Sequence, residues 1–232
     1  MKLTWDQAGG RLYETGVSNA VLYLPDAATG AYDMGYAWNG VTAITESPSG
    51  AEASPQYADN IKYLNLTSAE EFGATLEAFT WPVEFDQCDG SVSVVPGLTI
   101  GQQNRRPFGL SYLTKLGNDT VGDRFGQKLH LIYGAQAAPT EKAYATVNDS
   151  PEATTFSWEL TTTAVEVPGF NPTALVTLNS TLLSKANWEE LMSILHGTEA
   201  NDPRLPLPTE LFELVGFTGA GAGVAAAAEA AA

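Results

Sequence analysis

The sequence predicts a mainly β protein, an antiparallel β-sandwich or barrel with one flanking α-helix. Several long segments alternate apolar and polar residues at period two, as strands do when they bury one face. Turn-forming residues separate these segments, and strands joined by turns are typical of antiparallel rather than parallel sheets. One segment near the C-terminal end instead has the period of an amphipathic helix.

Two short strands are expected in the first part of the chain. Residues 20–24 form an apolar run, and residues 40–45 alternate with Val41 and Ile44 on opposite faces. The turn-rich segment between them carries three aromatic residues, Tyr32, Tyr36 and Trp38.

Residues 46–66 show no periodicity and contain two prolines, so we expect an extended loop. A loop of about twenty residues is uncommon inside a compact domain and is usually functional or ordered by a partner. Its apolar side chains, among them Tyr57, Ile61, Tyr63 and Leu64, would be exposed if the loop stood free in water. Burial against a neighbouring subunit and packing back on the same domain both remain open.

The clearest strand pattern lies in residues 71–80, where every second residue is apolar. Pro82 ends the pattern because proline cannot donate to a sheet ladder, and the chain then turns through residues 83–90. A helix is the competing interpretation, since residues 68–71 fit a capping box and Phe72 and Leu76 have helical spacing. Gly73 weakens a helix, and the regular alternation favours the strand.

The second half of the chain is richer in strand patterns, with a turn region expected at residues 118–126. The predicted strands are residues 108–116, 127–135, 154–167 and 173–178. The one predicted helix, within residues 184–196, has an apolar stripe made of Trp188, Leu191, Met192 and Leu195. Gly197 is placed as the residue that ends it, and residues 209–217 are expected to add a helical turn or an edge strand.

Three parts of the chain follow from these patterns: an N-terminal arm at residues 1–11, a β domain at 12–217, and an Ala- and Gly-rich tail at 218–232. No apolar run reaches the ~20 residues that a membrane-spanning helix needs, and the N-terminal residues lack the apolar region of a secretory signal. The single cysteine, Cys88, excludes an intrachain disulfide and agrees with folding in a reducing cytoplasm. We expect it to be a small packed residue rather than a reactive thiol.

The charge of the chain is strongly acidic. Eleven Lys and Arg residues stand against 27 Asp and Glu residues, a formal net charge of −16. Such a surface repels phosphates, so conventional nucleic-acid binding is not expected. Acidity suits both plain solubility and a channel through which DNA slides without sticking.

The residues of the common catalytic and metal sites are mostly missing from the sequence. His130 and His196 have no metal-ligand spacing, and one cysteine is too few for a structural zinc site. No G-x-S-x-G elbow occurs, and the aspartates of the turns lack EF-hand spacing. A carboxylate pair for glycoside hydrolysis stays open, because the fold and not the spacing assembles it. We therefore predict that the protein is not an enzyme and holds no cofactor or metal.

Four segments carry a resemblance to a known family. They are ADNIKYLNLTSAEEFGATLEAFTWPVEFDQCDGS (58–91), RPFGLSYLTKLGND (106–119), EKAYATVNDSPEATTFSWELTTT (141–163) and KANWEELMSILHG (185–197). Together they resemble the major tail tube proteins of siphoviruses, bacteriophages with long non-contractile tails. The resemblance covers roughly residues 10–215, and its specificity lies in the combination, since no single segment is a catalytic motif.

The resemblance implies a structural virion protein, made in the host cytoplasm, with a β-sandwich or barrel-like domain and a flanking helix. Its copies form hexameric rings that stack into the tail tube through loops and arms. The implied partners are further copies of the chain, the tape-measure protein inside the tube, and the tail-tip and tail-terminator proteins at its ends. DNA passes transiently during genome ejection, and no membrane anchor is implied.

The implied roles fall on two sets of residues. Contact between stacked rings is expected from residues 46–66, and specifically from Tyr57, Asp59, Asn60, Ile61, Tyr63 and Leu64; the arm at residues 1–11 is expected to assist. The channel wall is expected to include polar faces of the long strands, with Glu71, Thr75 and Glu77 on one strand or Glu159, Thr161 and Thr163 on another; which strand faces the channel stays open. The alternative function is a soluble β-sandwich module that binds carbohydrate, with Tyr32, Tyr36 and Trp38 stacking on sugar rings; core packing of these aromatics is the competing expectation.

Overall fold

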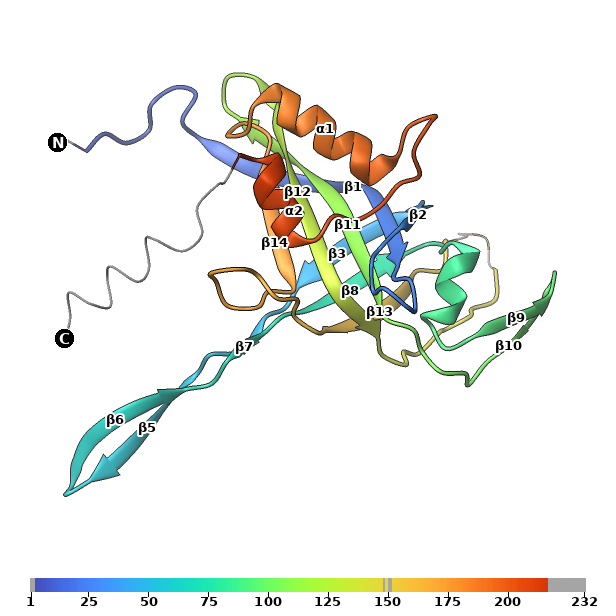
Figure 1. Cartoon of the computed structure of the whole chain (residues 1–232), viewed down its shortest axis with the longest axis horizontal. Coiled ribbons are helices and arrows are strands. Elements are labelled where there is room, and N and C mark those ends of the chain that lie inside the picture. The colour runs from blue at the N-terminus through green and yellow to red at the C-terminus, as the bar shows by residue number, and fades with distance from the viewer. Residues whose placement is uncertain (1–2, 148, 150–151, 217–232) are drawn as a thin grey trace.

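The computed structural model describes residues 3–147, 149 and 152–216 (Figure 1). The fold is mainly β, as predicted, and its largest element is an eight-stranded antiparallel sheet in the order β2-β1-β11-β12-β13-β8-β3, with β14 also paired to β12. Its strands are β1 (Leu12–Leu24), β2 (Met34–Trp38), β3 (Val41–Glu46), β8 (Gly73–Ala78), β11 (Phe108–Asn118), β12 (Gly122–Ala137), β13 (Phe156–Thr162) and β14 (Leu175–Asn179).

Three two-stranded sheets project from or extend the main sheet. They are β4 (Ser49–Gly50) with β7 (Glu70–Glu71), β5 (Ala53–Ala58) with β6 (Ile61–Thr67), and β9 (Val92–Val95) with β10 (Leu98–Ile100). The helical elements are the 3₁₀ helix η1 (Val83–Gln87), α1 (Lys185–His196) and α2 (Pro208–Leu214). In Figure 1 the β5–β6 and β9–β10 hairpins extend away from the main sheet on opposite sides.

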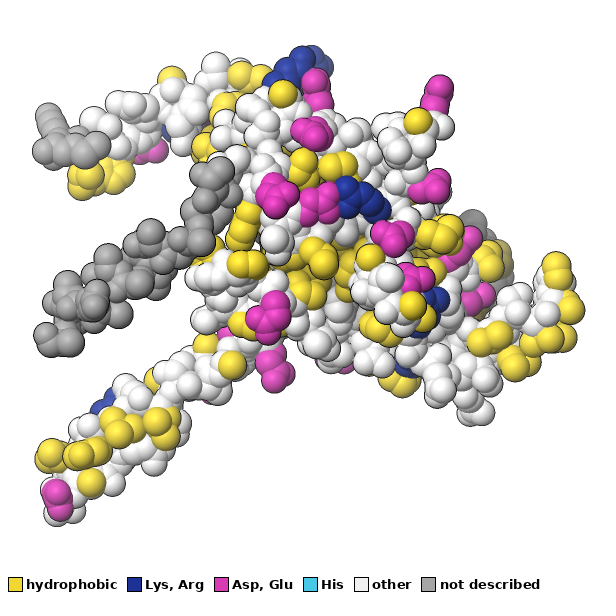
Figure 2. All heavy atoms as spheres, in the orientation of Figure 1, with side chains coloured by type: hydrophobic (Ala, Val, Ile, Leu, Met, Phe, Trp, Pro, Cys, Tyr) yellow, Lys and Arg dark blue, Asp and Glu magenta, His cyan; other side chains and the backbone are white. Residues whose placement is uncertain are grey.

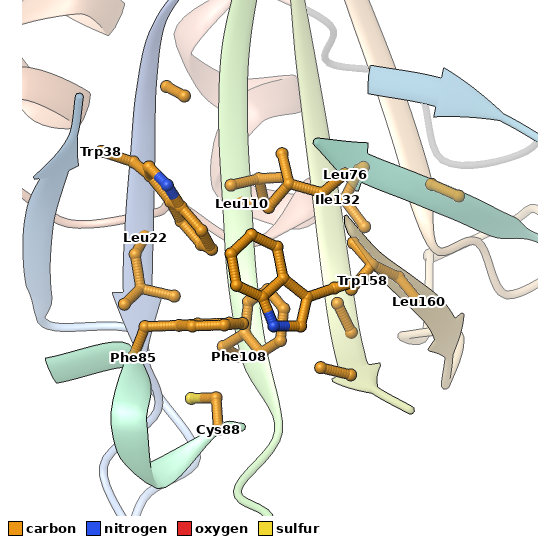
Figure 3. Packing of buried hydrophobic residues seen from close by; sticks show 14 of the residues in the cluster. Leu22, Trp38, Leu76, Phe85, Cys88, Phe108, Leu110, Ile132, Trp158 and Leu160 are labelled. Carbon is orange, nitrogen blue, oxygen red and sulfur yellow. The ribbon is translucent and has the colours of Figure 1, made fainter. Parts of the chain in front are cut away.

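The main sheet curls around an apolar core. Trp38 of β2 and Trp158 of β13 have three strands between them in the sheet order, yet their ring centroids are 5.7 Å apart. Only a strongly curved sheet brings such strands together, because neighbouring strands are about 4.8 Å apart. The curvature also carries β3 close to β1. The core residues of this cluster include Leu22, Leu76, Phe85, Leu110, Ile132 and Leu160, which surround Trp158 in Figure 3.

The competing helix within residues 71–80 is excluded, because β8 pairs with β13 on one side and β3 on the other. Its alternation has the expected cause: Ala74, Leu76 and Ala78 are buried in the core, while the residues between them are partly exposed. The face assignment for β3 was wrong. A register shift between Val41 and Ala43 places both Val41 and Ile44 against the core, because an extra residue in one strand breaks the period of two.

The remaining strands differ from prediction mainly in length. β1 begins at Leu12, β12 begins at Gly122 inside the expected turn region, and β13 ends at Thr162. Strand β2 was missed, since its segment was interpreted as turn-rich. Its pairing with β1, from Ala20 opposite Trp38 onward, supplies the hydrogen bonds that the local sequence did not reveal.

A second core lies between the other face of the sheet and the two helices. Leu191 and Leu195 of α1 are buried there, and Trp188 and Met192 pack against them, as the predicted stripe required. Ser184 caps α1, since its hydroxyl accepts a hydrogen bond from the N–H of Asn187. The remaining members of this core come from the sheet and from α2, among them Tyr23, Leu131, Tyr133 and Leu211.

Helix α1 ends at His196, and the next residue, Gly197, has a φ of 75°, which glycine adopts without strain. Residues 208–214 form helix α2 rather than an edge strand. The predicted Ala- and Gly-rich tail lies outside the described residues. Within the described residues, neither α1 nor α2 combines the length and apolar character needed to cross a membrane.

Cys88 is a packed core residue, as predicted, and it lies next to Phe85 and Phe108 (Figure 3). Burial raises the pKa of its thiol from 9.0 to about 12.

We expect the folded protein to react with a maleimide far more slowly than the urea-unfolded chain. Between pH 9 and 12 the thiol of the unfolded chain loses its proton while the buried thiol keeps it. The free energy of unfolding is therefore unaffected by this group well below pH 9 and falls by up to about 1.4 kcal/mol per pH unit between pH 9 and 12.

The measurement is a set of urea titrations across this pH range with wild type and Cys88→Ala. The difference between the two isolates the thiol, because buried tyrosines such as Tyr23, whose pKa burial also raises, are common to both proteins. Equal pH slopes would contradict the prediction.

Candidate functional site

The segment predicted as an irregular loop is instead an antiparallel hairpin, β5–β6. Asp59 and Asn60 form its tight turn and have φ values of 50° and 64°. Two-residue hairpin turns of type I′ require positive φ at both central residues, and Asp and Asn tolerate this conformation. The Asp59-Asn60 pair was therefore the signal in the sequence that could have identified the hairpin.

The hairpin has one apolar face. Strand β5 runs without an extra residue, so the partners of its alternate positions share a face. Leu66, Leu64 and Ile61 pair with Ser54, Gln56 and Ala58 and therefore lie on the same face. Tyr57 lies on the other face, opposite Lys62. Tyr63 is the extra residue of β6 at the register shift, between Lys62 and Leu64.

This apolar face has no cover within the described chain. Ile61 is 63% exposed and Leu66 is 57% exposed, and Figure 2 shows apolar side chains along the projecting hairpin. The segment therefore does not pack back on the described part of its own domain. An isolated two-stranded hairpin is at best marginally stable in water, and exposed apolar faces of this kind are typical of interaction surfaces.

The hairpin is fixed to the main sheet through a continuous ribbon. Strands β3 and β8 lead into the β4–β7 pair, where Ser49 opposes Glu71 and Gly50 opposes Glu70. Gly50 has a φ of 83°, and a Cβ there would lie 2.4 Å from the carbonyl oxygen of Ala69. The ribbon thus positions the hairpin at a defined distance from the core.

Most of the residues predicted to line a channel come together on one surface. Thr75 of β8 lies opposite Glu159 of β13, Glu77 lies opposite Ser157, and Thr161 lies opposite Gly73. Cross-strand partners share a face, and this face is the one that points away from the buried Leu76 and Trp158. Four of the six predicted residues therefore form one polar sheet surface.

The other two residues do not belong to this surface. Glu71 lies in β7, at the base of the hairpin ribbon. Thr163 lies beyond the end of β13, and its N–H donates to the carbonyl oxygen of Gly134. These two positions lie outside the surface because the alternation of residue types continues past the points where β8 and β13 pair with each other.

A charged cluster occupies the seam where the curled sheet brings β3 close to β1. His130 of β12 places Nδ1 2.9 Å from Glu46 and Nε2 3.3 Å from Glu14, and its ring stacks on Tyr112 with centroids 4.6 Å apart. Burial raises the pKa of Glu14, but hydrogen bonds from Lys128, Thr114 and His130 outweigh it, so the pKa lies below its usual value. The cluster joins four strands through side chains.

The aspartates of the turns contact separate partners. Asp89 is buried beside Arg105 and Lys142 and accepts a hydrogen bond from the indole of Trp158 at 3.2 Å. Asp123 pairs with Lys115 at the surface. Among the described residues, no group of three or more His, Cys, Asp or Glu side chains is placed to hold a metal ion.

Replacing Asp89 by alanine is expected to lower the free energy of unfolding by about 3 kcal/mol, because two cations and an indole lose a buried acceptor. Asp123→Ala is the matched control, since its pair with Lys115 is about half exposed on both sides and is worth less than about 1 kcal/mol. Urea titration of both variants measures the difference, and equal losses would show that Asp89 is not an anchor.

An open pocket of about 470 Å³ lies beside β2 and the end of α1. Its lining contains one ionisable side chain, His196, whose pKa burial lowers below its usual value. A lone neutral imidazole does not supply the acid and base of a paired catalytic site. The pocket therefore does not point to a reaction.

The aromatic platform of the alternative function is not formed. Trp38 and Tyr32 are 3% and 7% exposed, and Tyr36 packs partly against the core. Trp38 and Tyr32 are too deeply buried to stack on a sugar ring. Core packing is thus the observed fate of these aromatics.

The described part of the N-terminal arm is exposed and is tethered at its base. Leu3 and Trp5 stand in solvent, while the N–H groups of Gly9 and Arg11 donate to the carboxylate of Asp119. Tethering at its base leaves the apolar part of the arm available for contacts.

A scan against known protein families finds no match to the sequence, and a search of curated proteins finds none either.

Proposed function

We propose that this protein is the structural subunit of a bacteriophage tail tube. Its copies form hexameric rings that stack into a hollow cylinder, which holds the tape-measure protein and conducts DNA at infection. The tail-tip and tail-terminator proteins bind the ends of the cylinder.

The observation that carries the proposal is the β5–β6 hairpin. It extends from the sheet on a paired ribbon and exposes Ile61, Leu64 and Leu66 on one face. A monomeric protein gains nothing from a projecting apolar hairpin, whereas a stacked assembly buries it against the next ring. The exposed arm with Leu3 and Trp5 offers a second contact of the same kind.

The polar surface of β8 and β13 suits a channel wall. It carries Thr75, Glu77, Glu159 and Thr161 in a chain of net charge −16. Carboxylates on such a wall repel DNA phosphates over roughly 8–10 Å at physiological salt. DNA would then pass without binding.

Size-exclusion chromatography and negative-stain microscopy of the purified chain, over a range of concentrations, test the proposal. Rings or tubes with a central channel support it. Monomers at every concentration, also after addition of a preformed tail tip, would overturn it. Addition of the tip matters because a free subunit that needs a nucleus would otherwise be mistaken for a monomeric protein.

A further inference from the structure

The hairpin β9–β10 is a second projecting element that the sequence analysis did not identify. Strand β10 runs without an extra residue, so Leu98 and Ile100 lie on one face and Thr99 on the other. Their partners follow them: Val95 opposes Leu98, Val92 opposes Ile100, and Ser93 opposes Thr99. Four aliphatic side chains therefore form one apolar face.

These four side chains are all exposed, from 41% at Val92 to 53% at Val95. No charged residue occurs between Ser91 and Asn104 in a chain of net charge −16. In the described chain, β9 and β10 pair only with each other, and a two-stranded hairpin of this kind is marginally stable alone. The apolar face of the hairpin is therefore not covered by any other part of the described chain.

The base of the hairpin is held firmly. The N–H of Gln103 donates to the carbonyl oxygen of Gly90, and Arg105 reaches the buried carboxylate of Asp89. Arg105 also donates to the carbonyl oxygen of Ala137. Anchoring at the base gives the hairpin a fixed direction, which lowers the entropy lost when it binds a partner.

We propose that the apolar face of β9–β10 packs against the apolar face of the β5–β6 hairpin of a second copy of this chain. This inference rests on the proposed function and adds the pairing of two specific surfaces to it. The residues in contact are Val92, Val95, Leu98 and Ile100 on one copy and Ile61, Leu64 and Leu66 on the other.

Charge and placement select a second copy as the occupant. The two hairpins lie on opposite sides of the domain, and Figure 2 shows apolar side chains on both. A contact between different surfaces on opposite sides repeats from copy to copy, which is the geometry of a ring or filament. Residues 53–67 contain one Asp and one Lys, so two acidic subunits meet there without net repulsion.

Cysteine cross-linking tests the pairing. Leu98→Cys and Leu64→Cys are prepared separately in a Cys88→Ala background, mixed, assembled and treated with a short bis-maleimide. A covalent dimer is expected from the mixture and not from either variant alone. Ser93→Cys, on the opposite face of β9, replaces Leu98→Cys as the matched control and is expected to cross-link at least about tenfold less with Leu64→Cys.

The outcomes separate this inference from the proposed function. Tubes without a covalent dimer from the mixture of Leu98→Cys and Leu64→Cys, or with equal cross-linking from Ser93→Cys, overturn the pairing and leave the tube intact as a proposal. A dimer without rings or tubes supports the pairing and contradicts the tube. Absence of both dimer and assembly overturns both.

A second variant gives a readout that does not depend on cysteine chemistry. Val95→Asp with Leu98→Asp is expected to raise the concentration needed for assembly by about tenfold or more. Ser93→Asp with Thr99→Asp adds the same charge on the opposite face and is expected to change it much less. Equal effects of the two pairs would overturn the inference.

Discussion

Changing Ile61 and Leu64 to aspartate is expected to abolish assembly of the protein while leaving the domain folded. Both side chains lie on the apolar face of β5–β6 and are exposed in the single chain, so folding loses little when they change. In an assembly, each aspartate would be buried without a partner, at a cost of several kcal/mol per carboxylate. We expect monomers by size-exclusion chromatography, no rings or tubes by microscopy, and an unchanged urea midpoint.

A control with the same added charge lies on the other face of the same strands. Asn65→Asp with Thr67→Asp changes positions whose partners are Pro55 and Ala53, on the face that carries Tyr57. The variant with both changes is expected to assemble at a protein concentration close to the one that wild type needs. Tubes from the Ile61 and Leu64 variant, or equal losses from both pairs, would reject the role of the apolar face.

A shortened hairpin removes the surface without adding charge. Replacing residues 56–64 by Asn-Gly joins Pro55 to Asn65, which already oppose each other, through a turn of type I′. The expected product is a folded domain that no longer polymerises. A polymer from this variant would mean that ring contacts lie elsewhere.

The strands of the core could be predicted because burial imposes the period of two. Leu76 of β8 and Trp158 of β13 face the core, and their immediate neighbours in each strand do not. The alternation is therefore visible in the sequence. The β5–β6 hairpin is not buried against the rest of the described chain and therefore has no such constraint. Its regular structure comes from the turn at Asp59 and Asn60, which a search for periodicity does not detect.

The position of the polar surface could be predicted only in part. Alternation indicated which side chains of β8 and of β13 are polar, but not that the two strands are neighbours. Thr75 and Glu159 are 84 residues apart in number and lie opposite each other. Pairing of such distant strands depends on the packing of the whole core, and the ends of pairing at Glu71 and Thr163 depend on it as well.

Reversing the charges of the polar surface of β8 and β13 is expected to make the assembled tube bind DNA, which the wild-type tube does not retain. Glu77 and Glu159 lie diagonally across β8 and β13, and neither is opposite a charged residue, so two lysines fit the same positions. The net charge of each subunit then rises by four. Lysines facing DNA release its condensed counterions, which gives tight binding at low salt and steep release as salt rises.

The measurement is co-sedimentation of a short labelled duplex with assembled tubes at increasing salt. Wild-type tubes are expected to leave the duplex in the supernatant, and Glu77→Lys with Glu159→Lys to carry it into the pellet at low salt. Glu189→Lys with Glu190→Lys is the matched control, because it makes the same charge change on exposed positions of α1, the helix that covers another part of the sheet. If the α1 variant retains as much DNA as the sheet variant, bulk charge explains the binding and the polar surface of β8 and β13 is not the channel wall. If only the sheet variant retains DNA, the carboxylates of Glu77 and Glu159 are the groups that keep DNA from the wall in the wild-type tube.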